Sequence, residues 1–133
     1  MIIRPYTPDD GRTIGLMLVT EGLEPEEMEF VTGNTFVAED YDGSVVGFYT
    51  YKLEGVFPHL QHYCVDKDAR DGTLDIARAL IREFRRRMKS LGYAKAIINS
   101  PKCKRKIGRL IQWYFKAEPY GTDDAHKFFL VNI

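Results

Sequence analysis

The helix expected over residues 74–91 is the feature that most constrains how this chain can fold. Its apolar residues recur at helical spacing and form a single stripe: Ala77, Leu80, Ile81, Phe84, Met88 and Leu91. Gly92 follows as a stop signal. Two strand-like runs flank this helix, HLQHYCVD at 59–66 and AKAIINS at 94–100. A strand, an amphipathic helix and a second strand predict a β-α-β crossover with a parallel strand pair.

The strands before this crossover are expected to be antiparallel. Asp42-Gly43 lies between two β-rich runs and is a strong signal for a hairpin with strands at about 35–41 and 44–53. PYGT at 119–122 predicts a turn or short strand, and a last strand is expected at 126–132. Together these strands predict an α/β (α+β) fold, with one mixed, mostly antiparallel sheet around a central β-α-β crossover, flanked by helices.

Three further helices complete the predicted order. Thr7-Pro8-Asp9-Asp10 has the composition of a helix start, and this helix should run to about Glu21. A short acidic helix is expected at 24–30, and a basic helix from Pro101 to about Ala117. The order is α-α-β-β-β-α-β-α-β, without a linker or repeat.

Length and composition are those of an ordinary globular protein. We expect 133 residues to form one domain, residues 1–133. No apolar run reaches the roughly 20 residues that a membrane-spanning helix needs, so no membrane partner is expected. With only two cysteines, a reduced, cytoplasmic setting is the default expectation. Cys64 and Cys103 are too few for a disulfide framework or a zinc site, and no metal is expected.

The charges are unevenly distributed along the chain although the net charge is zero. Residues 1–58 hold 11 acidic and 3 basic residues, whereas residues 59–133 hold 8 and 16. Such asymmetry reflects a charged partner or contact between the two halves, and the sequence leaves both readings open.

The junction between 59–66 and 74–91 resembles the signature of the GCN5-related N-acetyltransferase (GNAT) superfamily. In that family a strand ends in an apolar residue and Val. The loop that follows leads into the central helix and has a fixed pattern: Arg or Gln, any two residues, Gly, any one residue, and Gly or Ala. Here Tyr63-Cys64-Val65 ends the strand, Arg70 stands at the Arg/Gln position and Ala77 at the last small position. The element order extends the resemblance over essentially the whole chain.

The resemblance implies that acetyl-CoA is the cosubstrate and predicts where it binds. The backbone of Cys64, Val65 and Lys67 would pair with the pantetheine arm, as an added strand does. Arg70 and Ala77 would lie at the pyrophosphate, beside the helix N-terminus. Further basic residues, among them Lys104 and Arg105, would lie near the coenzyme phosphates.

The loop departs from the family pattern and resembles a degenerate pyrophosphate loop. It is about two residues longer than usual, and Asp75 stands at the first Gly position. A carboxylate there should repel the coenzyme phosphates. The alternative is that the carboxylates near the helix N-terminus simply cap it. The predicted helix cap is Thr73 or Asp71.

Acetyl transfer needs an acid for the departing thiolate and a base for the acceptor ammonium. The family often takes its acid from a Tyr of the last helix, in a pattern like Tyr-x-x-x-Gly-Phe, and Tyr114 stands there with Glu118-Pro119 in place of Gly-Phe. The alternative for Tyr114 is packing within an aromatic cluster. His62, or His59, could be the base. A structural histidine, with a water chain as the base, is the alternative.

Two functions therefore follow from the sequence. The first is an N-acetyltransferase that moves acetyl directly from acetyl-CoA to a cationic primary amine, of a small molecule or a peptide, by analogy with the family. The second is a catalytically inactive GNAT-fold module that binds nucleic acid or a protein. A homodimer is open under either function, and nucleic acid is the less favoured partner.

Overall fold

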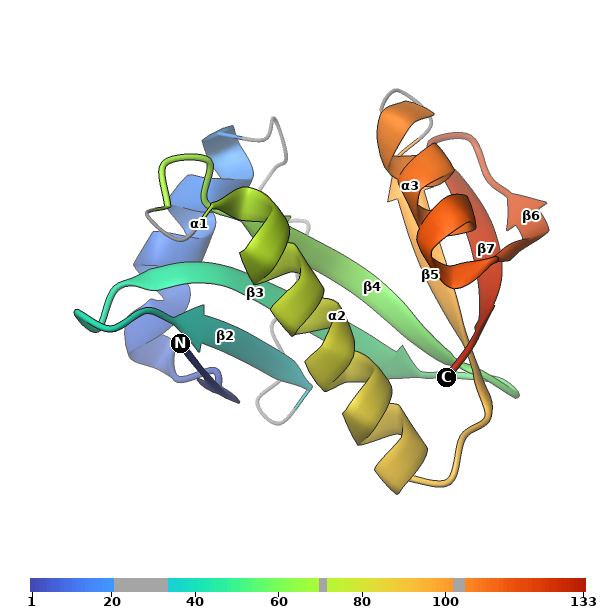
Figure 1. Ribbon diagram of the computed structural model, residues 1–133, viewed down its shortest axis with the longest axis horizontal. Helices are drawn as coiled ribbons and strands as arrows, with labels where there is room; N and C mark the ends of the chain where they lie inside the picture. The colour runs from blue at the N-terminus through green and yellow to red at the C-terminus, as the bar shows by residue number, and fades with distance from the viewer. Residues whose placement is uncertain (21–33, 70–71, 102–104) are drawn as a thin grey trace. The chain divides into compact units, whose positions relative to one another are not determined.

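The computed structural model describes residues 1–20, 34–69, 72–101 and 105–133, with the backbone alone at Thr73, Pro101 and 105–107 (Figure 1). The acidic helix predicted at 24–30, Arg70 and Lys104 lie outside the described residues. The elements in chain order are β1 (Ile2–Pro5), the 3₁₀ helix η1 (Pro8–Asp10), α1 (Gly11–Thr20), β2 (Thr35–Glu39), β3 (Val45–Leu53), β4 (Pro58–Val65), α2 (Thr73–Ser90), β5 (Lys95–Pro101), α3 (Arg105–Phe115), β6 (Glu118–Thr122) and β7 (His126–Asn132).

The strands form a mixed sheet in the order β1-β2-β3-β4-β5-β7-β6. β4 and β5 run parallel, with His59 opposite Ile97 and Leu60 opposite Ile98, whereas the β1–β2, β2–β3, β5–β7 and β6–β7 pairs are antiparallel. The predicted fold class and the β4-α2-β5 crossover are thus confirmed. Among the described residues, the parallel ladder consists of these two residue pairs and ends at Leu60.

The contacts group the chain into two compact units. The first comprises residues 1–50 and 62–84, and the second residues 51–61 and 85–133. The single domain expected from the length stays a prediction.

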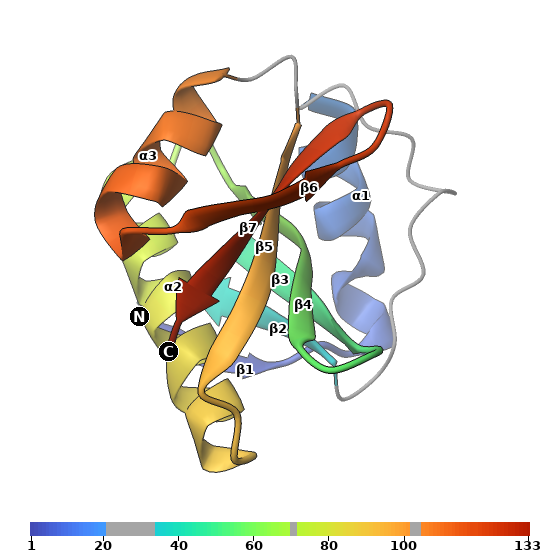
Figure 2. The same cartoon turned by 90° about the vertical axis from the view of Figure 1, so that its right-hand side faces the viewer.

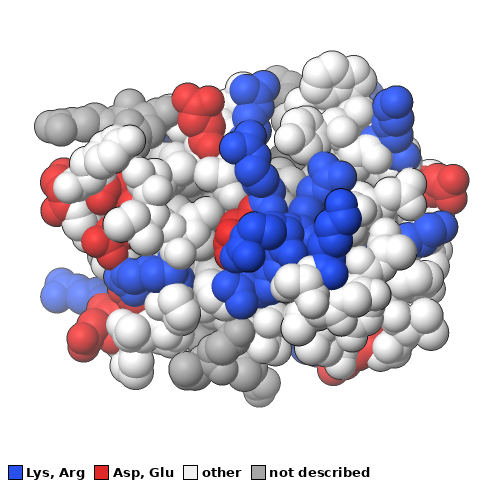
Figure 3. All heavy atoms as spheres, turned by 60° about the horizontal axis from the view of Figure 1, so that its bottom comes forward, with Lys and Arg blue, Asp and Glu red and all other residues white. Residues whose placement is uncertain are grey.

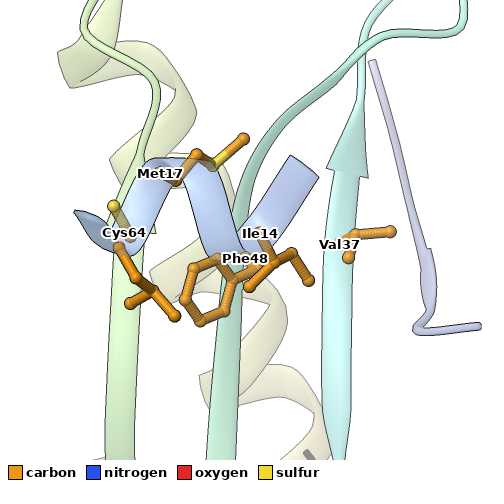
Figure 4. Close-up of a cluster of buried hydrophobic side chains, with 6 residues drawn as sticks. Ile14, Met17, Val37, Phe48 and Cys64 are labelled. Atoms are coloured by element: carbon orange, nitrogen blue, oxygen red, sulfur yellow. The ribbon is translucent and has the colours of Figure 1, made fainter. Parts of the chain in front are cut away.

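In the first unit the two faces of the strands bury different side chains. On one face a hydrophobic cluster joins α1 to the strands; its members are Ile14, Met17, Leu18, Val37, Phe48 and Cys64 (Figure 4). On the other face Tyr49 stacks on Phe36, with ring centroids 5.4 Å apart, and meets the edge of Phe84 on α2 at 5.9 Å. This alternation is what a strand buried on both faces requires.

The N-terminal segment is held by a network of charged side chains. The Arg4 guanidinium donates two 2.9 Å hydrogen bonds to the Asp10 carboxylate and one of 2.6 Å to Glu39. Asp10 also accepts the Thr7 N–H at 2.9 Å, at the predicted helix start. The Arg4 hydrogen bonds lower the pKa of Asp10 to about 2. The helix start is therefore fixed to β1 and β2.

In the second unit α3 lies along β5 and β7 (Figure 2). At Gly108 a Cβ would lie 3.4 Å from the Ser100 Oγ and 3.6 Å from the Phe129 ring, which are ordinary van der Waals distances that a methyl group would also fit. Phe128 alternates to the opposite face, where its ring meets the edge of the His59 ring at a centroid distance of 5.4 Å.

Helices α2 and α3 both end at a residue with a left-handed backbone. At the end of α2 the Gly92 N–H donates to Lys89 O and the Tyr93 N–H to Met88 O, with Gly92 at φ +94°, which confirms the predicted stop. At the end of α3 the Ala117 N–H donates to Gln112 O, and Lys116 takes the left-handed position at φ +50°. Lys116 is thus in a conformation that favours glycine.

Candidate active site

The turn after β4 uses one of the carboxylates that the sequence concentrates there. The Asp66 N–H donates to Val46 O at 2.8 Å, which keeps this residue in register with β3. The Asp66 carboxylate accepts the Asp68 N–H at 3.0 Å, and Asp66 O accepts the Ala69 N–H at 3.3 Å. At Asp66, therefore, the carboxylate stabilises a local turn.

The start of α2 follows directly from this turn. Gly72 has φ +79°, and its carbonyl accepts the Ile76 N–H at 3.4 Å. Asp75 is exposed in the first helical turn, where a carboxylate interacts favourably with the helix dipole and opposes a second anion. Asp71 and the Thr73 side chain lie outside the described residues, so their role as helix cap stays a prediction.

Gly47 brings the end of β4 and the start of α2 together. A Cβ at this position would lie 2.9 Å from the backbone oxygen of Cys64, and 3.1 Å from side-chain atoms of Ile76 and Leu80. Gly47 was not among the residues predicted from the sequence. A glycine inside a strand is itself a signal of close backbone approach, and that signal could have identified it.

Two predicted coenzyme-binding residues lie at the end of β4, and a third follows in the turn. The Cys64 side chain is buried in the α1 cluster, so only its backbone can serve a ligand (Figure 4). Val65 is partly buried, and Lys67 is exposed in the turn. Ala77 is partly buried on α2. Cys64, Val65, Lys67 and Ala77 all belong to the first unit.

His62 is partly buried in β4, two residues before Cys64 and therefore on the same face of the strand. Its neighbour Tyr63 points to the other face. Burial raises the pKa of Tyr63 above its ordinary value of 10.0, so this phenol stays protonated even in alkaline solution. At His59 burial lowers the pKa, and among the described residues its buried Nε2 has no hydrogen-bond partner. His59 is thus held neutral against Phe128.

A side chain continues the contact between β4 and β5 where their ladder stops. The Asn99 Nδ2 donates a 3.0 Å hydrogen bond to the backbone oxygen of Gln61, directly after the Leu60–Ile98 pair. The Asn99 side-chain amide thus donates to a β4 carbonyl where a backbone N–H of β5 would donate if the ladder continued. No local pattern around Asn99 indicates this role, because it depends on where the ladder ends.

Tyr114 lies near the C-terminal end of α3, in the second unit, and is 43% exposed. Its ring packs edge-on against Phe115 at 5.0 Å. The ring contact fits the packing alternative, and the exposure leaves part of the residue open to a ligand. Arg105 is the first residue of α3, where only its backbone is described.

Metal-ligating clusters and membrane-spanning helices are both absent from the described ranges. Residues 1–20, 34–69, 72–101 and 105–133 contain no group of three or more His, Cys, Asp or Glu side chains that could hold a metal ion. None of the helices in these ranges combines the length and apolar character needed to cross a membrane.

The sequence matches no protein-family model and no curated protein. The structure, in contrast, matches solved acetyltransferases over 99% of this chain. A GNAT superfamily phosphinothricin acetyltransferase from Sinorhizobium meliloti, in complex with AcCoA, is 18% identical, with a TM-score of 0.75 and 88% of its own chain covered. An IAA acetyltransferase from Bacillus cereus is 16% identical, with a TM-score of 0.74 and 99% covered. A ribosomal-protein alanine N-acetyltransferase from Escherichia coli is 12% identical, with a TM-score of 0.71 and 93% covered.

The chain therefore has the GNAT fold, as its element order predicted. At these identities the likeness establishes the fold, which all three acetyltransferases share.

Proposed function

We propose that this chain is an acetyl-CoA-dependent N-acetyltransferase acting on a cationic primary amine. The observation that carries the proposal is the junction from β4 to α2, where a strand end, a short turn and a helix N-terminus meet over Gly47. A helix N-terminus offers backbone N–H groups and a favourable dipole to a phosphate group. Solved structures with the same fold are acetyltransferases, and one of them contains AcCoA.

The residues at this junction fit the coenzyme in part. Gly72 leaves the backbone before α2 open, because no described atom outside its chain neighbours lies within 4 Å of a Cβ placed there. The β4 backbone at Cys64 and Val65 is our proposed partner for the pantetheine arm. Asp75 opposes the fit, since its carboxylate lies in the first helical turn. We therefore expect the coenzyme to bind weakly rather than not at all.

In the proposed reaction the acceptor amine attacks the thioester carbonyl carbon. A C–N bond forms and the C–S bond breaks. Tyr114 donates its proton to the departing thiolate, and the ammonium proton leaves to His62 or to a water held there. Tyr114 is suited to this step because 43% of its side chain is exposed.

The charge distribution supports a cationic acceptor. The first unit carries 15 acidic and 6 basic residues. Seven of the acidic residues lie within residues 1–30: Asp9, Asp10, Glu21, Glu24, Glu26, Glu27 and Glu29. A net negative charge raises the local concentration of cations and speeds their arrival. A positively charged amine is the acceptor that this charge favours.

Calorimetric titration with acetyl-CoA tests the proposal. We expect weak binding to the unaltered protein and about fivefold tighter binding to Asp75→Asn, which corresponds to about 1 kcal/mol for a charge at a helix N-terminus. Asp68→Asn is the matched control, since it removes an exposed charge from the same loop but outside the helical turn. If neither the unaltered protein nor Asp75→Asn gives a heat of binding at millimolar acetyl-CoA, the inactive binding module is favoured instead.

A further inference from the structure

The second unit carries a strong positive charge, of which the acetyl-transfer hypothesis uses only Lys104 and Arg105, as predicted neighbours of the coenzyme phosphates. It holds 13 Lys and Arg residues and 4 Asp and Glu residues, a net charge of +9, which the first unit balances with −9. Lys and Arg side chains gather on the face of the molecule that Figure 3 presents. This separation by unit is sharper than the separation by halves of the sequence.

Within the second unit, the end of α2 contributes a row of cations. Arg85 and Lys89 are four residues apart, and Arg86 and Lys89 three apart, so the three side chains lie on neighbouring positions of one helix face. Arg86 and Lys89 are exposed. Arg85 joins this row to the next helix, because its guanidinium lies 5.5 Å from the centre of the Phe115 ring on α3.

α3 adds an exposed aromatic side chain among further cations. Trp113 is 77% exposed, which is unusual for so large an apolar side chain. Exposed Arg109 lies four residues before it, and exposed Lys116 three residues after it. Arg109 and Trp113 are four residues apart on α3, so an anion bound by Arg109 would have the indole ring beside it. Leu110, 57% exposed, enlarges the apolar part of the same surface.

From this arrangement we infer that the surface formed by Arg86, Lys89, Arg109 and Trp113 binds single-stranded nucleic acid. Cations that track a phosphate backbone, with an aromatic ring on which a base stacks, are the combination that binds single strands without sequence preference. An acidic polypeptide would match the charge but would leave the indole without a planar partner. The inference goes beyond the proposed acetyl transfer and does not depend on Tyr114 or on the β4–α2 junction.

The single tryptophan makes the inference directly measurable. Titration of the whole protein with a short oligothymidylate, without acetyl-CoA, should quench the tryptophan fluorescence. All of this fluorescence comes from Trp113, because it is the single tryptophan of the sequence. The affinity, measured by anisotropy of a labelled oligothymidylate, should fall as salt is added. In a plot of the logarithm of the binding constant against the logarithm of the salt concentration, each phosphate contact should contribute about 0.7 to the slope. Arg86→Gln, Lys89→Gln and Arg109→Gln should each reduce the slope by about that amount. Lys52→Gln, an exposed cation of the same unit paired with Glu54, should leave it unchanged.

Trp113→Leu should weaken binding about tenfold at every salt concentration and leave the slope unchanged, since stacking is not a counterion effect. The affinity of Trp113→Phe, which keeps an aromatic ring, should lie between those of the unaltered protein and Trp113→Leu. Circular dichroism should show both variants folded, because the side chain is exposed. The inference is overturned if oligothymidylate does not quench Trp113 at low salt. It is overturned equally if polyglutamate or duplex DNA binds as tightly as the single strand and Trp113→Leu has no effect.

Discussion

At the scale of single residues, the structure separates what a side chain does from what its backbone does. Cys64 is a predicted coenzyme contact, and its side chain proves to be part of the cluster under α1, which leaves only the backbone for that role. Gly47 has no side chain, and its lack of a Cβ is what allows β4 and α2 to meet. Both residues matter for the candidate site through their main chains.

Gly47→Ala should destabilise the fold by about 1–3 kcal/mol, because the new methyl group would overlap the Cys64 carbonyl and crowd Ile76 and Leu80. Urea unfolding measures the loss. Gly15→Ala on α1 is the matched control: among the described residues nothing lies within 4 Å of its Cβ position, so the substitution should stabilise the helix by up to about 1 kcal/mol. If both variants were equally stable, the close approach at Gly47 would not exist.

Tyr114→Phe should lower kcat about 100-fold and leave the melting temperature nearly unchanged, since only a hydroxyl is removed from an exposed side chain. Steady-state kinetics and a thermal melt measure the two quantities. Tyr120→Phe removes a hydroxyl from another exposed tyrosine of the same unit and should alter neither. A fall in stability that matches the fall in activity would assign Tyr114 to packing against Phe115.

At the scale of elements, the strongly patterned segments were predictable from the sequence and the weakly patterned ones were not. The 74–91 helix and the Asp42-Gly43 hairpin appear as α2 and as the β2–β3 turn, where Asp40 O accepts the Gly43 N–H at 3.2 Å and Gly43 takes φ +88°. β1 was not predicted, and the segment of β6 was predicted only as a turn or short strand, because each is short and contains proline. Both strands exist through pairing with a neighbour, which local pattern does not encode.

The candidate site was less predictable than the fold for a related reason. Residue types at the end of β4 could be matched to a family pattern, but side-chain burial could not. The Asn99 contact with Gln61 O depends on the register of two strands far apart in the sequence. Arg70 and Lys104 lie outside the described residues, so their predicted contacts stay predictions.

Lys116→Gly should stabilise the protein by about 0.5–1 kcal/mol, because glycine adopts φ +50° without the steric cost that lysine bears. Chemical denaturation measures the change. The control is Lys127→Gly in β7, where a glycine should destabilise the strand instead. Destabilisation by both would show that α3 does not end in a left-handed residue.

The Arg4–Asp10 pair predicts a specific acid dependence. The pKa of Asp10 is lowered from 3.8 to about 2, so its contribution is present above pH 4 and is lost as the pH falls towards 2. That contribution is about 2 kcal/mol. Between pH 4 and pH 2, the free energy of unfolding should therefore fall more steeply for the unaltered protein than for Asp10→Asn.

Asp9→Asn provides the comparison, since Asp9 is exposed and adjacent. This variant should keep the steep acid limb. A curve for Asp10→Asn that runs parallel to that of the unaltered protein would mean that the Arg4 pair does not form in solution.

At the scale of the whole molecule, charge is segregated between the two units as −9 and +9. Under the proposed function the negative unit attracts the amine. Under the further inference the positive unit attracts a polyanion. Neutralisation of one half by the other is the alternative left open by the sequence, and salt dependence distinguishes attraction of ligands from such internal pairing.

Replacing Glu24, Glu26 and Glu27 together by Gln should raise KM for a cationic amine at low ionic strength, with an effect that shrinks as salt is added. Initial rates at two salt concentrations measure this. An uncharged amine analogue serves as the control and should show no change. A KM that is constant at low salt would identify this acidic segment as a solvated surface without a role in acceptor binding.

The two outer strands of the sheet have a consequence for the behaviour of the protein in concentrated solution. β6, exposed along its whole length, contains Pro119, which has no N–H, and an irregular register between Pro119 and Gly121. β1, at the opposite end of the strand order, is only four residues long and ends at Pro5. A neighbouring molecule that meets either strand finds an interrupted row of backbone donors. Within the described residues, both outer strands are therefore poor templates for a strand of a neighbouring molecule.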